Sequence, residues 1–442
     1  MGRLFARDVH GPTAPWWQEE APPDDAAPAL EGTVDADVAI VGGGFTGLWT
    51  ALELVRRKPA ARVVLLEAAR CGDGASGRNG GFLHGLWASL PRLVELLGAD
   101  AAVALATEAT GVYDAVRALG DDVWLREGGL LTVSTGPAHD ALLERAVAAA
   151  ARVGAPEEAV LLSSDELSVR SPRFRGAVFY RDGATVQPAR LVRALRRAAL
   201  AAGAVVHESS PVVGIADGVV QCAGGSVRAQ EIVLATNAAA ARWPASRSVA
   251  VFRSAIVLTE PVADLRDRIG WERGEAISDE RTYLNYFRTT DDGRVLMGSA
   301  SGDLPRAEAA LRAFFPALAD VRVAARWEGA IDVSSDRLPF VSTAPGTRVH
   351  YALGYTGNGV GPSWLVGRTL ASLALGEEVS SPLVTRHVPS LPPEPLRSIG
   401  ARVVRRALLA VDDAEEAARR PPRWAVGVAR LPELLGVRVA SR

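Results

Sequence analysis

Two short apolar runs on either side of a helical pattern begin the regular part of the chain. Asp37–Val41 and Arg62–Leu66 are rich in β-branched residues, as expected of strands buried on both faces of a parallel sheet. Residues 44–57 between them carry apolar side chains at spacings of 3, 4 and 7, the period of an amphipathic helix, at Leu48, Ala51, Leu52 and Val55. Lys58 and Pro59 end the pattern, so the sequence predicts a strand–helix–strand unit.

The pattern changes further along the chain. Helices are predicted over 88–119, 137–153, 188–202, 362–375 and 397–419, and buried strands over 128–133, 204–207, 211–215, 231–235 and 349–353. Between 249 and 326 the runs resemble strands of an antiparallel sheet, at 254–260, 283–288 and 294–298. We therefore expect a second domain inserted into the first. Residues 1–35, rich in Pro and acidic residues, are predicted to form an extended surface arm, with order beginning at Asp37.

A glycine motif joins the first predicted strand to the first predicted helix. Gly42, Gly44 and Gly47, with Phe45 and Thr46 between them, fit the pattern G-x-G-x-x-G. In this position the glycines permit a tight turn, close approach of the backbone to a pyrophosphate, and close helix–strand packing, while the helix N-terminus attracts the anion. The alternative is a helix start that merely requires glycine.

An acidic residue follows at the spacing that a dinucleotide site requires. Glu67 ends the second predicted strand, 20 residues beyond the last glycine, where a carboxylate accepts hydrogen bonds from ribose hydroxyls. Its charge would repel a 2′-phosphate and so argues against NADP. The next loop, residues 74–82, contains four glycines with Ser76, Arg78 and Asn79, and suits a flat ring and its diphosphate. A flexible surface loop is the alternative for this segment.

Several segments between about residues 15 and 380 share the pattern of one family. They are Pro15-Trp16-Trp17, residues 37–48, 74–82, 182–188, 233–238, 286–288, 292–294, 335–339 and 354–360. In this order and at these intervals the chain resembles the FAD-dependent D-amino-acid oxidase superfamily, in the branch that contains glycine oxidase, sarcosine oxidase and γ-glutamylputrescine oxidase. The agreement is more specific than any single motif.

The resemblance implies that FAD is the dinucleotide. Gly42, Gly44, Gly47 and Glu67 would hold its ADP half. The flavin and pyrophosphate would be lined by Ser76, Gly77, Arg78, Asn79, Gly80 and Gly81, and adenine would meet the backbone of Val212 or Val213, with Ala235, Thr236 and Asn237 nearby. Backbone N–H groups of Gly357, Asn358, Gly359 and Val360 would face the flavin N1/C2=O edge, where the reduced ring is anionic.

The chain departs from the family pattern at three points. Asn358 stands where many relatives carry histidine, which leaves a neutral polar group beside the flavin. Cys71 and Cys222 do not lie at the family's covalent attachment positions, so we expect non-covalent FAD. Lys58, the only lysine, ends the first helix, on the wrong side for the lysine that some relatives use in oxygen reduction. Oxidase activity is therefore not assured by the sequence.

Four residues are candidates for orienting the substrate: Tyr286, Arg288, His84 and Tyr355. In this reaction class a neutral amine lies over the flavin and a hydride passes from its α-carbon to N5, giving an imine that water hydrolyses. Each candidate has an alternative. The tyrosines could be packed aromatic residues, Arg288 an exposed strand residue and His84 a structural histidine.

Composition narrows the remaining possibilities. With 49 basic and 51 acidic residues the formal charge is −2, so no global positive field recruits nucleic acid. No uncharged apolar stretch approaches the roughly 20 residues of a membrane span, and two cysteines favour a reducing compartment, so we expect a cytoplasmic protein without a metal site. The basic stretch 397–406 is interpreted as a solvated helix face, with docking of a homo-oligomer or protein partner as the alternative.

The predicted fold is α/β, a Rossmann-like FAD-binding domain of the D-amino-acid oxidase type with an inserted antiparallel substrate domain. Its parts are an arm (1–35), the FAD-binding domain (36–90, 155–248 and 327–385), the substrate domain (91–154 and 249–326) and a tail (386–442). The predicted function is oxidation of a C–N bond in a small amine or amino acid, with O2 as acceptor and H2O2 as product. The alternatives are an FAD dehydrogenase that uses another acceptor, and a flavin-binding partner subunit without turnover.

Overall fold

The predicted strand–helix–strand unit forms the centre of a first sheet, whose strands run in the order β17-β18-β11-β1-β2-β8, with β10 and β9 joined to β11. The computed structural model describes residues 13–240, 243, 247–385, 387–393 and 395–434. The strands of this sheet are β1 (Gly32–Val41), β2 (Val63–Leu66), β8 (Val205–His207), β9 (Val212–Ala216), β10 (Val219–Cys222), β11 (Gly225–Leu234), β17 (Phe340–Thr343) and β18 (Val349–Leu353). β1 pairs in parallel with both β2 and β11, which brings segments nearly 200 residues apart into contact.

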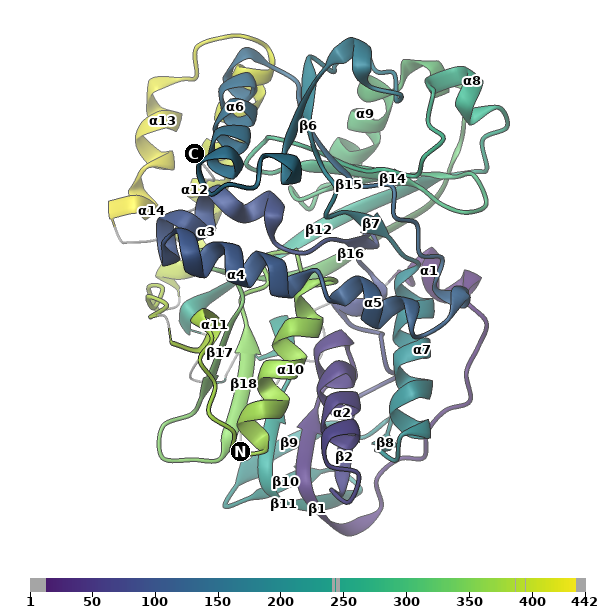
Figure 1. Ribbon diagram of the computed structural model, residues 1–442, viewed down its shortest axis with the longest axis vertical. Coiled ribbons are helices and arrows are strands. Elements are labelled where there is room, and N and C mark those ends of the chain that lie inside the picture. The colour runs from purple at the N-terminus through teal and green to yellow at the C-terminus, as the bar shows by residue number, and fades with distance from the viewer. Residues whose placement is uncertain (1–12, 241–242, 244–246, 386, 394, 435–442) are drawn as a thin grey trace.

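Three helices lie side by side against one face of the first sheet (Figure 1). They are α2 (Phe45–Arg57), α7 (Pro188–Ala201) and α10 (Pro362–Ala374), and α2 packs against both of the others. The apolar stripe predicted on α2 is buried between them, and Lys58 ends the helix with its N–H on the Leu54 carbonyl. These helices and the parallel strands are the Rossmann-like α/β arrangement expected from the sequence.

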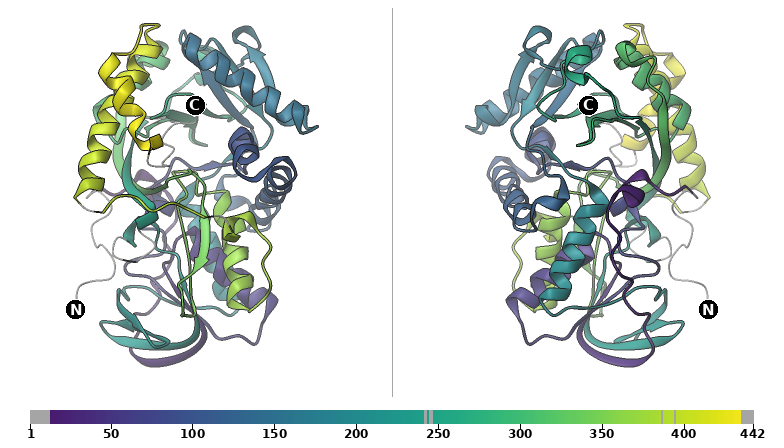
Figure 2. Two further views of the ribbon diagram at one scale, coloured as in Figure 1. Left: turned by 90° about the vertical axis from the view of Figure 1, so that its left-hand side faces the viewer. Right: turned by 90° about the vertical axis from the view of Figure 1, so that its right-hand side faces the viewer.

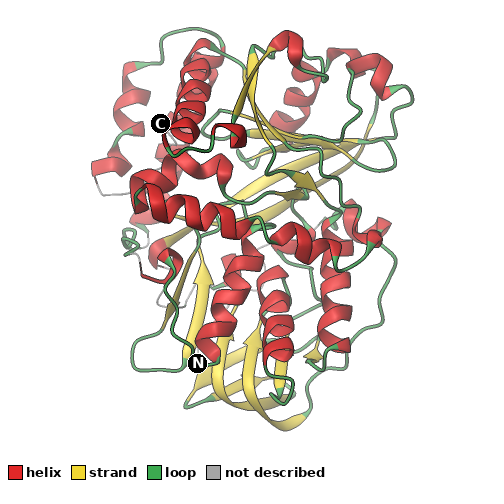
Figure 3. Cartoon of the chain, in the orientation of Figure 1, coloured by secondary structure: helices red, strands yellow, loops and turns green. Residues whose placement is uncertain are grey.

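A second sheet crosses the upper half of the molecule, where its long strands are drawn in yellow in Figure 3. Its order is β16-β12-β15-β14-β13-β4-β6-β5. The strands are β4 (Leu130–Ser134), β5 (Val160–Ser163), β6 (Gly176–Tyr180), β12 (Val249–Thr259), β13 (Ala276–Asp279), β14 (Asn285–Thr289), β15 (Val295–Ser299) and β16 (Val323–Ser334). The sheet is not purely antiparallel as predicted, because β13 and β4 pair in parallel.

The domain boundaries predicted at 155 and 327 differ from the observed membership of this sheet. Residues 160–163 and 176–180 were assigned to the FAD-binding domain, but as β5 and β6 they extend the second sheet from β4. β16 pairs with β12 from Val323 to Ser334, so its second half also belongs to the second sheet. Both assignments depended on sequence order, whereas strand pairing joins segments that are distant in the chain.

The remaining helices surround the second sheet or connect the two sheets. They are α1 (Trp16–Glu20), α3 (Leu90–Leu97), α4 (Ala99–Ala109), α5 (Val112–Arg117), α6 (Pro137–Arg152), α8 (Leu265–Ile269), α9 (Leu304–Phe314), α11 (Pro382–Thr385), α12 (Leu396–Glu416), α13 (Arg423–Ala429) and α14 (Leu431–Leu434). The helix predicted over 88–119 is therefore three helices, with Gly98 and Gly111 at the breaks. Phe82–Leu83 (β3) and Ala184–Thr185 (β7) form a separate two-stranded sheet.

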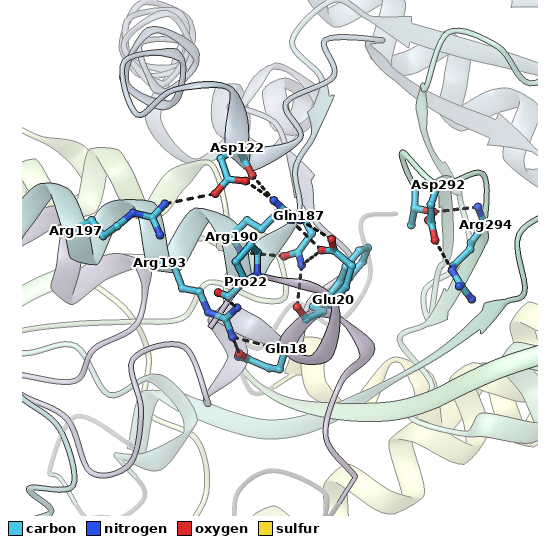
Figure 4. Close-up of polar contacts among 12 residues, drawn as sticks. Gln18, Glu20, Pro22, Asp122, Gln187, Arg190, Arg193, Arg197, Asp292 and Arg294 are labelled. Carbon is cyan, nitrogen blue, oxygen red and sulfur yellow. Dashed lines mark hydrogen bonds and ion pairs between the residues drawn. The ribbon is translucent and has the colours of Figure 1, made fainter. Parts of the chain in front are cut away.

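The N-terminal segment is not the extended surface arm that was predicted. Among its described residues, Trp17 on α1 is 0% exposed and Leu30 2%, and strand β1 already begins at Gly32 rather than Asp37. Glu20 accepts hydrogen bonds from Gln187 at 2.7 Å and from Arg190 at 2.6 Å, both at the start of α7 (Figure 4). Buried side chains and ion pairs to a core helix hold this segment in place; residues 1–12 lie outside the described part.

The tail is likewise packed on its own chain. The described residues after 386 form α12, α13 and α14, which lie along one side of the second sheet and of α6 (Figure 2). The first half of α12 keeps the solvated character predicted for 397–406, with Leu396 64% and Val403 48% exposed, whereas Leu408 and Asp412 in its second half are buried. The prediction of a single amphipathic helix here is confirmed, although it ends at Glu416.

Trp17 gives a direct test of the N-terminal packing. Its indole N–H donates to the Asn79 carbonyl at 2.8 Å, and its ring contacts Trp327 edge-on at 6.1 Å. We expect Trp17→Ala to lower the free energy of unfolding by about 3–5 kcal/mol, the range for a buried aromatic residue. Urea unfolding measures this, with Trp424→Ala as the control, because Trp424 is 51% exposed. Equal stability of the two variants would contradict the assigned packing.

Candidate dinucleotide and substrate site

The turn between β1 and α2 requires glycine at two positions. Gly42 has φ +112°, and a Cβ there would lie 2.5 Å from the Ala235 carbonyl oxygen at the end of β11. A Cβ on Gly47 would lie 1.9 Å from the Gly42 carbonyl oxygen. No real Cβ approaches a backbone atom this closely, so glycine at Gly42 and Gly47 is what allows strand, turn and helix to pack together.

The N-terminus of α2 and the end of β2 meet at this turn. The backbone N–H of Phe45 donates to Ser76 Oγ at 2.9 Å, and the N–H of Gly43 donates to Glu67 Oε2 at 2.7 Å. Burial raises the pKa of Glu67, while its hydrogen bonds with the N–H groups of Ala69 and Gly43 act in the opposite direction. The carboxylate is thereby fixed at the carboxyl edge of the parallel strands, where ribose binds in this class of fold.

These elements border a cavity of about 1640 Å³ that runs from the first sheet to the second. Most residues predicted to bind the cofactor line it. They are Gly42, Gly44, Phe45, Thr46, Glu67, Ser76, Arg78, Asn79, Gly80, Val212, Val213, Ala235, Thr236, Asn237, Gly357, Asn358, Gly359 and Val360. The other three, Gly47, Gly77 and Gly81, do not line the cavity and lie in the backbone that supports its wall. The tertiary structure therefore brings six separate segments of the chain to one cavity.

The loop at residues 74–82 is held by hydrogen bonds, which disfavours the alternative of a flexible surface loop. Asn79 Nδ2 donates to the carbonyls of Ala75 and Ser76, and Asn79 Oδ1 accepts from the Gly81 N–H at 2.7 Å. Arg78 reaches back to the Asp73 carbonyl at 2.9 Å. The polar side chains of this loop shape its backbone, so its free N–H and carbonyl groups keep fixed directions along the cavity.

Asp332 on β16 connects two further segments of the cavity wall, and the sequence analysis missed it. Its carboxylate accepts hydrogen bonds from the backbone N–H groups of Gly354 at 2.5 Å and Tyr355 at 3.2 Å, and from Asn237 Nδ2 at 2.7 Å. The side chain is 0% exposed, and burial raises its pKa to about 6. The only sequence signal was an acid inside an otherwise apolar run, Gly329–Val333.

The cavity fits a dinucleotide on the evidence of its own polar atoms. Thr236 Oγ1 and Asn237 Oδ1 are buried at its wall and have no hydrogen-bond partner in the described part of the chain. Buried polar atoms of this kind cost free energy unless a ligand or water pairs with them. Together with the glycine turn and the carboxylate of Glu67, they match the polar ribose and diphosphate of a dinucleotide.

Three of the four predicted substrate-orienting residues line the cavity: Tyr286, His84 and Tyr355. The Tyr286 ring packs edge-on against Phe82 at 5.5 Å, and its hydroxyl hydrogen-bonds with Ser254 Oγ at 2.8 Å. The Tyr355 hydroxyl hydrogen-bonds with Thr46 Oγ1 at 2.6 Å, which ties it to α2. Tyr286 is thus joined to β12 and Tyr355 to α2, and the orienting roles of Tyr286, His84 and Tyr355 stay predictions.

Arg288 is not placed in the cavity, nor is it the exposed strand residue of the alternative interpretation. It is 0% exposed, and its guanidinium donates to the carbonyls of Thr289, Gly81 and Val186. The guanidinium carbon also lies 5.6 Å from the Trp17 ring, and burial lowers the pKa to about 9. The guanidinium therefore meets the backbone of the 74–82 loop at Gly81.

The far wall of the cavity comes from the second sheet and was not predicted. β13 contributes Ser278 and Asp279, the segment between β13 and β14 contributes Glu280, Thr282 and Leu284, and the connection between β16 and β17 contributes Arg337. Asp279 accepts from the N–H of Asn285 at 2.9 Å and from its Nδ2 at 2.7 Å, and burial raises the pKa of Asp279 to about 7. Strand pairing alone brings this wall opposite the glycine turn, so no local motif marked it.

Neither of the two cysteines lines the cavity. Cys71 is buried beside the glycine turn, since a Cβ on Gly43 would lie 2.5 Å from Cys71 Sγ. Cys222 is buried in strand β10, and burial raises its pKa to about 11. Across the described residues, no helix has the length and apolar character needed to cross a bilayer.

The fold and the cavity define a dinucleotide-dependent oxidoreductase with a separate substrate wall, and comparison with known proteins identifies the family. The sequence pattern of the DAO family, described as FAD dependent oxidoreductase, matches residues 37–373. A probable oxidoreductase OrdL of Rhizobium meliloti is 31% identical over 408 residues, covering 85% of this chain and 92% of the relative. The chain belongs to the DAO family of FAD-dependent oxidoreductases.

Two further relatives agree with this assignment. The γ-glutamylputrescine oxidoreductase of Escherichia coli is 30% identical over 370 residues, covering 79% of this chain and 85% of the relative. The crystal structure of glycine oxidase from Geobacillus kaustophilus superposes with a TM-score of 0.68 at 25% identity, covering 80% of this chain and 99% of the other. The family, the fold class and FAD as cofactor are thus confirmed.

Gly47 provides a test of the glycine turn. Overpacking of a close contact costs about 1–3 kcal/mol, so we expect Gly47→Ala to weaken FAD binding about 10- to 100-fold. The measurement is the flavin-to-protein absorbance ratio followed by titration of the apoprotein with FAD. Gly427→Ala on α13 is the control, because a Cβ there meets nothing within 4 Å. Full FAD content in Gly47→Ala would contradict the packing described for the turn.

Asp332 predicts a pH dependence of stability. Its pKa is about 6 in the folded protein, above its ordinary value, so the folded state holds a proton that the unfolded state releases. The bound proton stabilises the folded state fully below about pH 4. This stabilisation is lost as the pH rises through 6, and the free energy of unfolding then falls by on the order of 3 kcal/mol. We therefore expect the free energy of unfolding to fall from pH 4 to pH 7 relative to Asp332→Asn. Parallel pH profiles of the two proteins would contradict this prediction.

Proposed function

We propose that this protein is an FAD-dependent enzyme that oxidises a C–N bond of a small amine or amino acid. The single observation that carries the proposal is one cavity that joins the glycine turn and Glu67 to a wall from the second sheet bearing Tyr286. The names of two relatives agree with this substrate class, because one is a γ-glutamylputrescine oxidoreductase and the other a glycine oxidase. The amine itself is left to experiment.

Different residues along the cavity are assigned to the two ends of FAD. We assign the ADP half of FAD to Gly42, Gly44 and Glu67, and the flavin end to the 74–82 loop and residues 357–360. FAD, when bound, supplies the acceptor for the hydride of the substrate α-carbon. The N–H of Asn358, predicted to face the flavin, instead donates to the Tyr355 carbonyl at 2.9 Å. We assign to this end the N-terminus of α10, whose positive dipole end favours negative charge.

Tyr286 and His84 are proposed to orient the amine. Burial raises the pKa of Tyr286 to about 12, so its hydroxyl keeps its proton. Because the Ser254 hydroxyl donates to the Ser299 carbonyl at 3.2 Å, the Tyr286 hydroxyl donates to Ser254 Oγ and can accept a hydrogen bond from the amine. His84 Nδ1 donates to the Gly85 carbonyl at 3.1 Å, which leaves Nε2 to accept a hydrogen bond. An acceptor at this place favours an amine that approaches with an N–H group directed at the histidine.

The electron acceptor is proposed to be O2, giving H2O2, with non-covalent FAD. Support for non-covalent binding is that neither Cys71, beside the glycine turn, nor Cys222, in β10, lines the cavity. A dehydrogenase that passes electrons to another acceptor is the second candidate, because relatives carry both "oxidase" and "oxidoreductase" in their names. The flavin subunit without turnover gains no support from the tail, whose described helices pack on their own chain.

Anaerobic flavin bleaching tests this proposal. The purified holoprotein is mixed without oxygen with glycine, sarcosine, putrescine or γ-glutamylputrescine, and the flavin absorbance is followed. We expect at least one amine to bleach the flavin, and acid precipitation to release the flavin into the supernatant. Admission of air then separates the acceptors, because rapid return of the colour with H2O2 supports the oxidase. If dithionite bleaches the flavin but no amine does, the proposed substrate class is wrong.

A further inference from the structure

The C-terminal helix α12 lies beyond residues 37–373, which match the family, yet it contacts the wall of the substrate cavity. In Figure 2 it runs, in yellow, along the outer side of the second sheet. Its second half is the buried part, with Ala407, Leu408 and Val411 at 0%, 4% and 8% exposure. An element outside the shared fold therefore packs where the substrate-facing segment leaves the sheet.

One carboxylate of this helix binds the backbone of the cavity wall. Asp412 is 0% exposed; its Oδ1 accepts the N–H of Thr282 at 3.0 Å and its Oδ2 accepts the N–H of Tyr283 at 3.1 Å. Both N–H groups belong to the segment Glu280–Leu284, which connects β13 to β14. These two adjacent N–H groups lie outside the strands, so the carboxylate accepts the hydrogen bonds that the carbonyls of a neighbouring strand would otherwise accept.

Two further acids of α12, Asp413 and Glu416, form ion pairs that hold the helix in place. Asp413 lies 2.6 Å from an Arg281 nitrogen and 2.8 Å from an Arg306 nitrogen, and the Arg306 guanidinium holds the pKa of Asp413 down at about 2. Glu416 pairs with Arg281 and, at 2.5 Å, with Arg173. Because Arg281 is 8% exposed, its pairs are shielded from solvent and favour one position of α12 over the segment.

The opposite side of the same segment faces the cavity. Glu280, Thr282 and Leu284 line it, and Asp279 at the end of β13 accepts the N–H of Arg281 at 3.2 Å. The segment is thus held between Asp279 on one side and Asp412 on the other. Residues 282 and 283 form a turn, so the side chains of Thr282 and Leu284 line the cavity while the N–H groups of Thr282 and Tyr283 meet the helix.

We propose that Asp412 is a positioning residue for the substrate, which fixes the Glu280–Leu284 segment and thereby makes the C-terminal helix a determinant of amine binding. This inference rests on the proposed function. It adds that specificity is set partly from outside the family fold, by an element that contributes no group to the dinucleotide end of the cavity. Removing the carboxylate would release the segment while the glycine turn, Glu67 and the 74–82 loop stay in place.

The test compares Asp412→Asn with Glu433→Gln in the full-length holoprotein. Glu433 is an exposed acid on α14, so its variant makes the same chemical change away from the segment. Hydrogen exchange of the peptide containing residues 280–284 is measured first. The reduction of the flavin by the most active panel amine is then followed anaerobically over a range of amine concentrations. We expect faster exchange in Asp412→Asn alone, and about a tenfold weaker amine affinity, as for one lost hydrogen bond, with the limiting reduction rate within about threefold.

The outcomes separate this inference from the proposed function. Unchanged exchange of residues 280–284 in Asp412→Asn overturns the inference, and so does faster exchange with unchanged amine affinity. A fall in FAD content equal to the loss of affinity also overturns it, because the effect is then general. If no panel amine bleaches the wild-type flavin, the proposed function fails and the exchange result alone decides the positioning claim. Should Asp412→Asn not fold, Asp413→Asn, which loses the pairs with Arg281 and Arg306, must show faster exchange of the same peptide than the wild type, and unchanged exchange then overturns the inference.

Discussion

The contact of three backbone segments at the glycine turn is the constraint on which the rest of the structure depends. β1 lies between β2 and β11, and Gly42 can turn toward α2 only because no Cβ separates it from the Ala235 carbonyl. The same closeness places the start of α2, the carboxylate of Glu67 and the Thr236–Asn237 segment around one point. A dinucleotide site needs N–H groups, a ribose acceptor and a polar wall at that point, and this packing supplies all three.

Buried polar groups connect this point to the second sheet. Asp332 joins β16 to the loop at Gly354 and to Asn237, and Arg288 joins β14 to the carbonyls of Gly81 and Val186. Each is fully buried, and its pKa is displaced from the usual value because desolvation opposes its charge. Such groups are retained at a cost in solvation, and here they hold the loops that border the cavity in fixed relative positions.

The two ends of the chain strengthen the same region from outside. Trp17 and Glu20 fasten the N-terminal segment to α7 and to the 74–82 loop, and α12 is fastened to the segment that faces the substrate. In both cases arginines of the core meet acids of the terminal segment, which agrees with a chain whose cations are nearly all arginine. Planar guanidinium groups pair with carboxylates through two parallel hydrogen bonds, so these attachments have a defined geometry.

The sequence by itself determined the local parts: the first strand–helix–strand unit and the glycine turn followed by Glu67. The cofactor residues from Ser76 to Val360 stay predictions from the family resemblance. These are readable because glycine, proline and hydrophobic period act over a few residues. Only the tertiary structure decided that β5 and β6 join the second sheet, that Arg288 is turned away from the cavity, and that Asp332, Asp279 and Asp412 hold its walls. Strand pairing and burial act between residues far apart in the chain, so a side chain's role follows from the partners that folding brings to it and not from its neighbours in sequence.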